Sequence, residues 1–553
     1  MPIMTGNKIL LEMLKAEGIK YIFGNPGTSE SAIMDALEEC PEIEYILSTQ
    51  EGVSMGMADG YARSTKTPTF VNLHIDSGLA NGISLLNNAY AGGTPLILTA
   101  ANKDIRKLVE GRTNLVDMVK PFTKWAAEIT EAEQIPSAIR RAFNEAKTPP
   151  TGPVFLAFSA DALDKKAQVN IIPSRKEYHP PEPNTDAINK TVDIINSCTS
   201  PIILVGDRMA QSSNTNSLEN LAELIGAKVY STSYSEMNFP TTHPQYCGPL
   251  TPNPLTKKEL SKSDLIIGVG TNLFSSFFYF SGEFTSPTAK LIHIDSAFTE
   301  IGKSEPTDIG ILADPGIAVE KISKIIKEKQ SGYNTERIIE QNIKIKKETE
   351  LSQQNWNEQV NKKWDNLPMA PERMMIEISK SLPQNSIIVD DSISSRSAMH
   401  GAIKFNKSGS IFGERGGAIG WGMGGALGIK LANPDKTVMA IIGDGSSMMT
   451  VQALWTAANY SIPVIYLICN NESYRILKLN MNVYKTQILK EKNPESKYIG
   501  ADFPIPLNIS KIAEAIGVYG KKITDPKDIS LEISKALKLN KPTVLDISID
   551  NKV

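Results

Sequence analysis

The chain has 553 residues and a net charge of −3, with 41% hydrophobic and 22% charged residues. These values are ordinary for a globular protein that can build several hydrophobic cores, and they give no indication of a nucleic-acid or anionic-membrane partner. At about 150 residues per domain, the length predicts three or four domains.

The cysteines and the N-terminus bear on the cellular compartment. The N-terminus lacks a basic segment followed by an apolar stretch, so we expect no signal peptide. No apolar run is long enough to span a membrane, so we expect a cytoplasmic location. The cysteines are scattered, which is typical of small buried side chains in a reducing compartment rather than of disulfides or a zinc site. They are Cys40, Cys198, Cys247 and Cys469.

The first third of the chain alternates predicted helices and strands. Apolar residues recur at helical spacing from Asn7 to Glu17, and Gly18 ends this helix. Alternation of this kind predicts a parallel sheet covered on both faces. Short apolar runs predict its strands at Tyr21–Phe23, Phe70–Leu73, Leu96–Thr99 and Val154–Phe158.

Two further blocks of the same kind follow. The proline-rich stretch 172–184 predicts a linker, and the polar stretch 322–366 predicts a connecting helix. We therefore expect three successive doubly wound α/β domains with parallel sheets, at residues 1–170, 186–330 and 366–553. Their strands are expected at Ile202–Val205, Lys228–Ser231, Leu265–Val269 and Leu291–Ile294, and then at Ile387–Val389, Val438–Ile442, Val464–Cys469 and Val544–Ile549.

The strongest motif joins two of the expected strands. The sequence Gly443-Asp444-Gly445-Ser446 directly follows one strand, a helical segment comes next, and Asn470-Asn471 directly follows the next strand. Ligands of open α/β sheets bind at this edge, and Mg²⁺ prefers oxygen ligands that it shares with phosphates. A GDG turn or an NN pair alone is more often a tight turn or a helix cap. This order and spacing instead favour a diphosphate held through Mg²⁺.

A second motif is Thr49-Gln50-Glu51-Gly52, which is followed by the sequence ADGYAR at residues 58–63. Taken alone, a glutamate before an apolar helix is usually a capping or surface residue. Together, however, the two motifs resemble those of thiamine diphosphate-dependent enzymes. The resemblance covers essentially the whole chain and implies an N-terminal pyrimidine-binding domain, a central domain and a C-terminal diphosphate-binding domain.

The resemblance implies two cofactors, thiamine diphosphate and Mg²⁺. It places Asp444, Asn471 and the Ser473 carbonyl on the metal ion. Glycines near the phosphates let backbone N–H groups approach them. The residues implied to contact the cofactor are Gly443, Gly445, Ser446, Tyr474 and Ser394.

The resemblance gives Glu51 an activating role. The thiazolium ring must lose its C2 proton to the cofactor's own 4′ nitrogen, which is a base only when N1′ of the pyrimidine is protonated. A buried carboxyl can supply that proton. Gly417 matches the carbonyl that faces the 4′ amine, and Ile419 matches the bulky residue beneath the rings. A dinucleotide loop is a weaker interpretation of this glycine-rich stretch, because no clear strand precedes it.

Several segments resemble benzoylformate decarboxylase and its acetolactate synthase-like relatives. His74 ends the sequence PTFVNLH at the position of an active-site histidine, and Thr28 matches a substrate-binding serine. A histidine there could move or hold a proton at the reacting carbon. The alternatives are a structural hydrogen bond for His74 and a bond from Thr28 to the GNPG turn.

Other positions depart from that pattern. Phe278 falls where benzoylformate decarboxylase has a second histidine, and an aromatic ring cannot relay protons. This puts simple release of an aldehyde in doubt and makes carboligation, the capture of a second carbonyl compound, an alternative reaction. Phe274, Phe277, Phe278 and Phe280 could instead form core. Ile476 and Leu477 are expected to face the substrate, Asn480 replaces an aromatic residue, and Arg475 could bind a substrate carboxylate or lie on the surface.

The resulting expectation is non-oxidative decarboxylation of a small 2-oxo acid. The alternatives are an acetolactate synthase-like carboligase, a 2-hydroxyacyl-CoA lyase and a non-catalytic relative. We expect no FAD, because no decisive flavin motif is present, although the acetolactate synthase branch often carries it. The resemblance implies at least a homodimer, and commonly a homotetramer, in which Glu51 of one subunit meets the diphosphate site of another.

Overall fold

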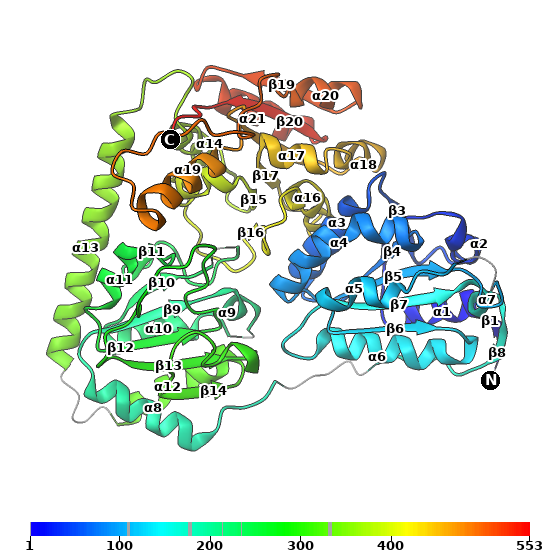
Figure 1. Ribbon diagram of the computed structural model, residues 1–553, viewed down its shortest axis with the longest axis horizontal. Coiled ribbons are helices and arrows are strands. Elements are labelled where there is room, and N and C mark those ends of the chain that lie inside the picture. The colour runs from blue at the N-terminus through cyan, green and yellow to red at the C-terminus, as the bar shows by residue number, and fades with distance from the viewer. Residues whose placement is uncertain (1, 108–110, 175–179, 213, 234, 330–334) are drawn as a thin grey trace.

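The computed structural model describes residues 2–107, 111–174, 180–212, 214–233, 235–329 and 335–553. They form three α/β domains, coloured blue to cyan, green, and yellow to red along the chain (Figure 1). Each domain has a six-stranded parallel sheet. The expected fold class is therefore confirmed, and residues 1–170, 186–330 and 366–553 remain our proposal for the domain boundaries.

The N-terminal sheet has a core on each face because successive strand residues point to opposite sides. In β4, for example, Val71 packs in one core and Phe70 in the other. The strand order is β3-β2-β4-β5-β7-β6, and β1 (Ile3–Thr5) pairs separately with β8 (Lys166–Gln168). The strands are β2 (Tyr21–Asn25), β3 (Glu44–Leu47), β4 (Thr69–Leu73), β5 (Leu96–Asn102), β6 (Trp125–Ile129) and β7 (Val154–Ser159). The helices are α1 (Gly6–Ala16), η1 (Thr28–Glu30), α2 (Ser31–Leu37), α3 (Glu51–Thr65), α4 (Ile75–Gly92), α5 (Leu115–Val119), η2 (Lys120–Phe122), η3 (Ala132–Gln134), α6 (Ile135–Lys147) and α7 (Ala160–Asp164).

The central sheet has a different strand order, β11-β10-β9-β12-β13-β14. Its strands are β9 (Pro201–Val205), β10 (Lys228–Ser231), β11 (Tyr246–Pro249), β12 (Leu265–Val269), β13 (Lys290–Asp295) and β14 (Ile309–Leu312). Its helices are α8 (Thr185–Ser197), α9 (Asp207–Gln211), α10 (Ser217–Ile225), α11 (Pro254–Leu260), η4 (Phe298–Glu300) and α12 (Pro315–Glu328).

The C-terminal sheet has the order β16-β15-β17-β18-β20-β19. Its strands are β15 (Ile387–Asp391), β16 (Ile411–Gly413), β17 (Val438–Gly443), β18 (Val464–Asn470), β19 (Tyr519–Ile523) and β20 (Thr543–Ser548). Its helices are α14 (Pro371–Lys380), η6 (Ile393–Ser395), α15 (Arg396–Ala402), α16 (Trp421–Ala432), α17 (Asp444–Met449), α18 (Ala453–Asn459), α19 (Arg475–Val483), η7 (Tyr484–Ile488), α20 (Ile509–Ala515) and α21 (Asp528–Leu539).

The connecting segments differ in part from the sequence-based expectation. The stretch expected as one helix from residue 322 divides into the end of α12, whose Ile322 and Ile326 are buried in the central core, and the long helix α13 (Thr335–Asn361). Of these two helices, α13 is the one that runs along the outside of the central and C-terminal domains (Figure 1). In the expected linker 172–184, residues 175–179 lie outside the described part, and the others form no helix or strand.

Helices α3 and α16 fasten the N-terminal domain to the C-terminal domain. They cross at such close range that a methyl group on Gly428 would lie 1.9 Å from the carbonyl oxygen of Met57. A methyl group on Gly60 would likewise lie 2.3 Å from the carbonyl oxygen of Gly425. Only glycine permits this approach, so the two helices pack backbone against backbone.

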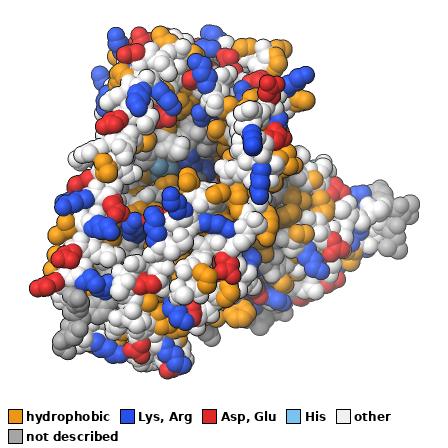
Figure 2. Space-filling model, turned by 60° about the vertical axis from the view of Figure 1, so that its left-hand side comes forward, with side chains coloured by type: hydrophobic (Ala, Val, Ile, Leu, Met, Phe, Trp, Pro, Cys, Tyr) orange, Lys and Arg blue, Asp and Glu red, His pale blue; other side chains and the backbone are white. Residues whose placement is uncertain are grey.

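Figure 2 shows acidic and basic side chains mixed over one face of the protein, with a hollow between the C-terminal domain above and the central domain below. Among the described residues, no helix is both long and apolar enough to cross a membrane.

Candidate functional site

Asp444 and Asn471 emerge at the same edge of the C-terminal sheet, because β17 and β18 are parallel neighbours. The Asp444 carboxylate accepts the N–H of Glu472 at 2.7 Å. The amide oxygen of Asn471 accepts the N–H of Ser473 at 3.0 Å. All of these side chains except that of Glu472 are buried. The predicted metal residues therefore form one hydrogen-bonded group. This group and the glycine-rich loop 416–422 beside it are together called the C-terminal half-site.

Gly445 gives this group a tight wall. A methyl group on Gly445 would lie 2.4 Å from Cε1 of Tyr474, so a side chain cannot be accommodated there. The Tyr474 ring packs edge-on against the Phe503 ring, with centroids 4.8 Å apart. The backbone N–H of Tyr474 donates to the Ala501 carbonyl at 2.7 Å. Tyr474 is thus fixed against the predicted phosphate loop.

The charge of the C-terminal half-site fits a cation. Burial raises the pKa of Asp444 to about 6, although backbone N–H groups of Gly445 and Glu472 partly oppose this. Among the described residues, no three acidic, histidine or cysteine side chains come together as metal ligands. Asp444, Asn471 and the Ser473 carbonyl therefore offer three oxygens, and phosphate oxygens would have to complete an octahedral Mg²⁺ shell. This donor set fits a Mg²⁺–diphosphate group.

The glycine-rich loop is held by a carboxylate that the sequence motifs do not reveal. Asp391, at the end of β15, accepts the N–H groups of Gly420 at 2.9 Å and Gly422 at 3.0 Å. Gly420 N–H also donates to Ser446 Oγ at 2.9 Å. Asp391 is fully buried, its Oδ1 has no hydrogen-bond partner among the described residues, and burial raises its pKa to about 7.

The other residues predicted in this half-site lie on its open side. Gly417 is exposed at φ +90°, and a methyl group on it would meet nothing within 4 Å. Ile419 and Ser394 are half-buried. The side chain of Met449, next to Gly420, is 46% exposed. This side of the loop thus faces open space within one chain.

Glu51 lies at the start of α3 in the N-terminal domain. Its two carboxylate oxygens accept hydrogen bonds from the side-chain amides of Asn25 and Asn81, each at 3.0 Å. A methyl group on Gly78 would lie 3.1 Å from Glu51 Oε1 and 3.2 Å from Cβ of His74. Glu51 and His74 therefore flank the same glycine, and we call their surroundings the N-terminal half-site.

A buried carboxylate orients His74. The imidazole Nδ1 lies 2.9 Å from Oε2 of Glu30 and 2.9 Å from Oγ of Ser29. Glu30 has no exposed surface and also accepts the backbone N–H of Gly27 at 2.9 Å. A methyl group on Gly27 would lie 2.2 Å from His74 Nδ1, so the GNPG turn packs on the ring. His74 is one-third exposed, so its ring is fixed on one side and accessible on the other.

The structure thus adds residues to the sequence-based site. Thr28 is exposed, and its hydroxyl forms no hydrogen bond with any described residue, so the predicted bond to the turn is absent from this part of the chain. Ser29, not Thr28, contacts His74. Ser29, Glu30 and Asp391 were missed because no local pattern distinguishes a buried polar residue after a turn or a strand from an exposed one.

Residues with strained backbone lie next to the predicted site residues of both half-sites. Ile75 and Ile393 are β-branched residues at φ +28° and +47°, and Glu472 is at φ +54°. Side chains with a branched Cβ rarely adopt positive φ, and such strain tends to persist at functional sites. Ile75 follows His74, Ile393 precedes Ser394, and Glu472 follows Asn471, so each lies next to a predicted site residue.

The predicted substrate residues are spread over two domains. Phe278, half-buried in the central domain, stacks on Tyr484 with ring centroids 6.5 Å apart. Tyr484 directly continues α19, the helix that carries Ile476 and Leu477. Leu477 is 49% exposed. Phe278 therefore contacts the continuation of the helix to which the other two predicted residues, Ile476 and Leu477, belong.

The structure also bears on two alternatives from the sequence. Phe274 and Phe280 pack against the central core, whereas Phe277 is almost fully exposed, so only part of the aromatic cluster is core. Arg475 donates to the backbone carbonyl of Lys552 at 2.8 Å and so fixes the C-terminal tail.

Two cavities adjoin the C-terminal half-site. One of about 730 Å³ is lined by Asn471 and Glu472 on one side and by the C-terminal tail on the other. A second, of about 750 Å³, lies between the three domains and touches Asp207, Arg415 and Gly416.

Comparison with known proteins decides the family. The thiamine pyrophosphate enzyme family matches as an N-terminal TPP-binding domain at residues 4–120, a central domain at 188–322 and a C-terminal TPP-binding domain at 394–547. The chain belongs to the thiamine pyrophosphate enzyme family. Within this family it is a decarboxylase or acetolactate synthase type of enzyme.

The similar family members come from both branches. Benzoylformate decarboxylase of Pseudomonas aeruginosa is 27% identical over 97% of this chain and 97% of its own length. A probable acetolactate synthase large subunit of Methanocaldococcus jannaschii is 29% identical over 99% of this chain and 92% of its own. The solved structure of a thiamine diphosphate-dependent 4-hydroxybenzoylformate decarboxylase of Rhodococcus jostii superposes with a TM-score of 0.83 at 26% identity and covers 99% of both chains.

Proposed function

We propose that this thiamine pyrophosphate enzyme catalyses the Mg²⁺-dependent, non-oxidative decarboxylation of a small 2-oxo acid. The observation that carries the proposal is the pairing of His74 with Glu30 beside Glu51. When bound, thiamine diphosphate supplies a nucleophilic carbon and an electron sink for the loss of CO₂. The protein's residues have to bind and orient the reactants and to move protons.

Glu51 is assigned the proton at N1′ of the cofactor. Asn25 and Asn81 donate to both of its oxygens, which fixes the plane of the carboxyl group. In the C-terminal half-site, Asp444, Asn471 and the Ser473 carbonyl would hold Mg²⁺ and the diphosphate. The Gly417 carbonyl would face the 4′ amine and Ile419 would support the rings, while Ser394, Ser446, Gly443 and Gly445 would lie near the phosphates.

His74 is assigned the proton transfer at the reacting carbon. Glu30 contacts Nδ1, which leaves Nε2 as the ring nitrogen available to a substrate. The carboxylate favours the tautomer with the proton on Nδ1 and stabilises the imidazolium form during transfer.

A specific observation favours a second candidate, acetolactate synthase-like carboligation. Phe278, which stacks on Tyr484, offers no proton at the position where benzoylformate decarboxylase has a second histidine. A second carbonyl compound, in place of a proton, could then take up the carbon fragment that remains after CO₂ loss. The aromatic pair would form an apolar wall for that acceptor.

The active unit is proposed to be a homodimer or homotetramer. Support comes from the bonding of each half-site: both Glu51 carboxylate oxygens bond within their own domain, while the open side of the glycine-rich loop exposes Gly417 and Met449. A second copy would supply the missing half of each site. Mixing Glu51→Gln and Asp444→Ala chains should then restore up to about a quarter of the active sites by subunit exchange. Mixtures as inactive as each parent would contradict a shared site.

The central test measures CO₂ release from pyruvate, benzoylformate, phenylpyruvate and branched-chain 2-oxo acids, with all organic products identified. CO₂ with an aldehyde supports decarboxylation, whereas CO₂ with an acyloin or acetolactate supports carboligation. No CO₂ from any acid despite bound cofactor would overturn both and leave acyl-CoA lyase chemistry. Repeating the assay after removal of Mg²⁺ tests the metal, and the absorbance spectrum of the purified protein tests the prediction that FAD is absent.

A further inference from the structure

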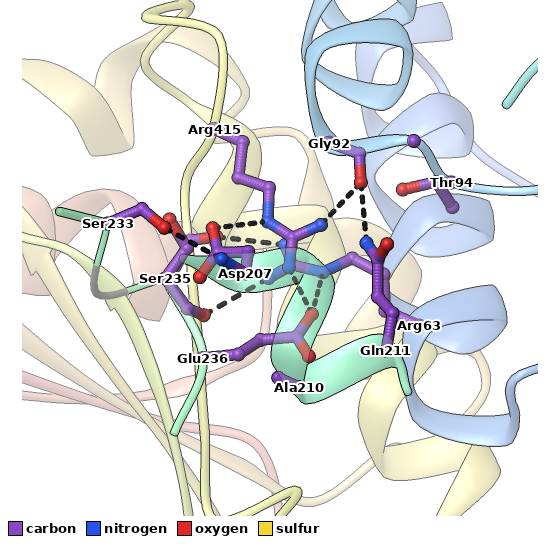
Figure 3. Close-up of polar contacts among 12 residues, drawn as sticks. Arg63, Gly92, Thr94, Asp207, Ala210, Gln211, Ser233, Ser235, Glu236 and Arg415 are labelled. Carbon is purple, nitrogen blue, oxygen red and sulfur yellow. Dashed lines mark hydrogen bonds and ion pairs between the residues drawn. The ribbon is translucent and has the colours of Figure 1, made fainter. Parts of the chain in front are cut away.

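Two buried arginines meet one glutamate where the three domains join. Arg63 Nε lies 3.1 Å from Glu236 Oε1, and Arg415 donates to the same oxygen (Figure 3). Arg63 belongs to α3 of the N-terminal domain, Glu236 to the central domain and Arg415 to the loop after β16. On its other side, Arg415 Nε lies 3.2 Å from Oδ2 of Asp207, also in the central domain. We call these four residues the three-domain network.

Backbone groups complete the network. Arg415 donates to the carbonyl of Gly92, the last residue of α4, at 2.6 Å, and Gln211 donates to the same carbonyl at 2.8 Å (Figure 3). Arg63 donates to the carbonyls of Gly413 at 2.8 Å and Ser235 at 3.1 Å. These bonds fix the C-terminal ends of α3 and α4 to the central domain and to the start of the glycine-rich loop.

The network is buried and its charges depend on one another. The side chains of Arg63 and Arg415 are 3% and 6% exposed, and that of Glu236 is 11% exposed. Burial, together with the nearby charge of Arg415, lowers the pKa of Arg63. For Arg415, burial is outweighed by the Glu236 and Asp207 carboxylates, which raise its pKa. Removing one carboxylate would leave two cations without adequate compensation, which is strongly unfavourable in a buried site.

The same elements lead to both half-sites. Helix α3 begins at Glu51 and reaches the network at Arg63, about 18 Å along its axis. Helix α4 begins directly after His74 and ends at Gly92. Arg415 directly precedes the glycine-rich loop 416–422, and Glu414 accepts the N–H of Gly417 at 2.5 Å.

We propose that the three-domain network positions the two half-sites relative to each other, with Glu236 of the central domain as its central positioning residue. This inference rests on the proposed function, because it assigns the network a role at the thiamine diphosphate site. The central domain then contributes to cofactor activation without touching the cofactor.

The test compares Glu236→Gln with a matched control in the full chain. Asp295→Asn breaks another buried ion pair, Arg208–Asp295 (Nε to Oδ1 2.7 Å), which lies wholly within the central domain. In the cofactor-free chain, Glu236→Gln should speed amide hydrogen exchange at residues 416–422 and 50–54 about tenfold, whereas Asp295→Asn should not. Glu236→Gln should also weaken thiamine diphosphate binding about tenfold in calorimetry with Mg²⁺.

If Glu236→Gln does not fold, Arg415→Lys decides, since it keeps the charge but loses the planar set of donors that reaches Gly92 and Glu236. It should give the same two changes in smaller size. The inference is overturned if the tested variant unfolds at lower temperature, as is also expected of Asp295→Asn, while exchange at both segments and cofactor affinity stay within about twofold of wild type. If the wild-type chain binds no thiamine diphosphate, the proposed function fails, and the exchange data alone still decide the role of the network.

Discussion

The N-terminal and C-terminal domains share one strand order, but the predicted site residues at their sheet edges differ in how they are paired and charged. Counting strands within each domain, both sheets run 2-1-3-4-6-5. In the N-terminal domain the key side chains, Glu51 and His74, already have partners, two amides for one and a carboxylate for the other. In the C-terminal domain, Asp444 and Asp391 are buried acids with raised pKa values, and one oxygen of Asp391 has no hydrogen-bond partner in the described part of the chain.

From this difference we expect one half-site to be preorganised and the other to be completed by what it binds. Paired groups such as Glu51 and His74 need little rearrangement before a reaction. A buried acid with a raised pKa, in contrast, is stabilised when a cation arrives, so the C-terminal half-site should gain stability from Mg²⁺–diphosphate. Substitutions in the two half-sites should therefore affect different measurements.

The largest effect is expected from Asp444→Ala. It removes the only carboxylate among the three predicted metal oxygens, so the affinity for Mg²⁺–thiamine diphosphate should fall well beyond the roughly 100-fold seen when a residue supporting a metal ligand is removed. Titration calorimetry with and without Mg²⁺ measures this. Near wild-type affinity would remove Asp444 from the metal site and with it the contrast between the half-sites.

Asp391→Asn should change the pH dependence of stability. Because the pKa of Asp391 is raised to about 7 in the folded chain, its ionisation opposes folding, and the free energy of unfolding falls as the pH rises towards 7. Between pH 5 and pH 8 the wild-type loss from this group is roughly 3 kcal/mol, which the asparagine should abolish. Urea unfolding of the cofactor-free chain at both pH values measures it. Equal losses in the two proteins would show that Asp391 does not titrate in this range.

Glu51→Gln should separate binding from activation. The side chain keeps its size and its place between Asn25 and Asn81, so cofactor affinity should change little. Exchange of the cofactor C2 proton, followed by NMR, should slow about 100-fold because the carboxyl proton is lost. Unchanged exchange would remove Glu51 from the activation step, and a large loss of affinity would mean that this half-site is not preorganised.

The smallest effect is expected at His74. Its ring is one-third exposed, so water can replace part of its function, and His74→Ala should lower kcat about tenfold. Ser29→Ala, which keeps the Glu30 contact, should lower kcat less than His74→Ala does. A kcat unaffected by His74→Ala would assign this histidine a structural role.

The strands show how far the sequence could predict the fold. Every strand predicted from an apolar run is one of the inner four of its sheet, while all the edge strands were missed: β3, β6, β11, β14, β16 and β19. An inner parallel strand is covered on both faces and so is continuously apolar. An edge strand such as β19, with Lys521 and Lys522, exposes alternate side chains and lacks that signal.

The sites follow the same logic. The GDG and NN motifs were predictable because each is a short motif that follows an inner strand. Glu30, Asp391 and the three-domain network were not predictable, because no motif marks them and each acquires its role from a partner that only folding brings next to it. Arg63 and Glu236, for example, are 173 residues apart.

The close crossing of α3 and α16 also has a consequence for how the chain is made. Helix α3 is buried along most of its length, largely under α16. The ribosome adds about 5–20 residues per second, and α16 is completed roughly 370 residues after α3, so α3 waits roughly 20–70 s for its cover. During that interval the helix that carries Glu51 lacks the cover that α16 gives it in the folded chain.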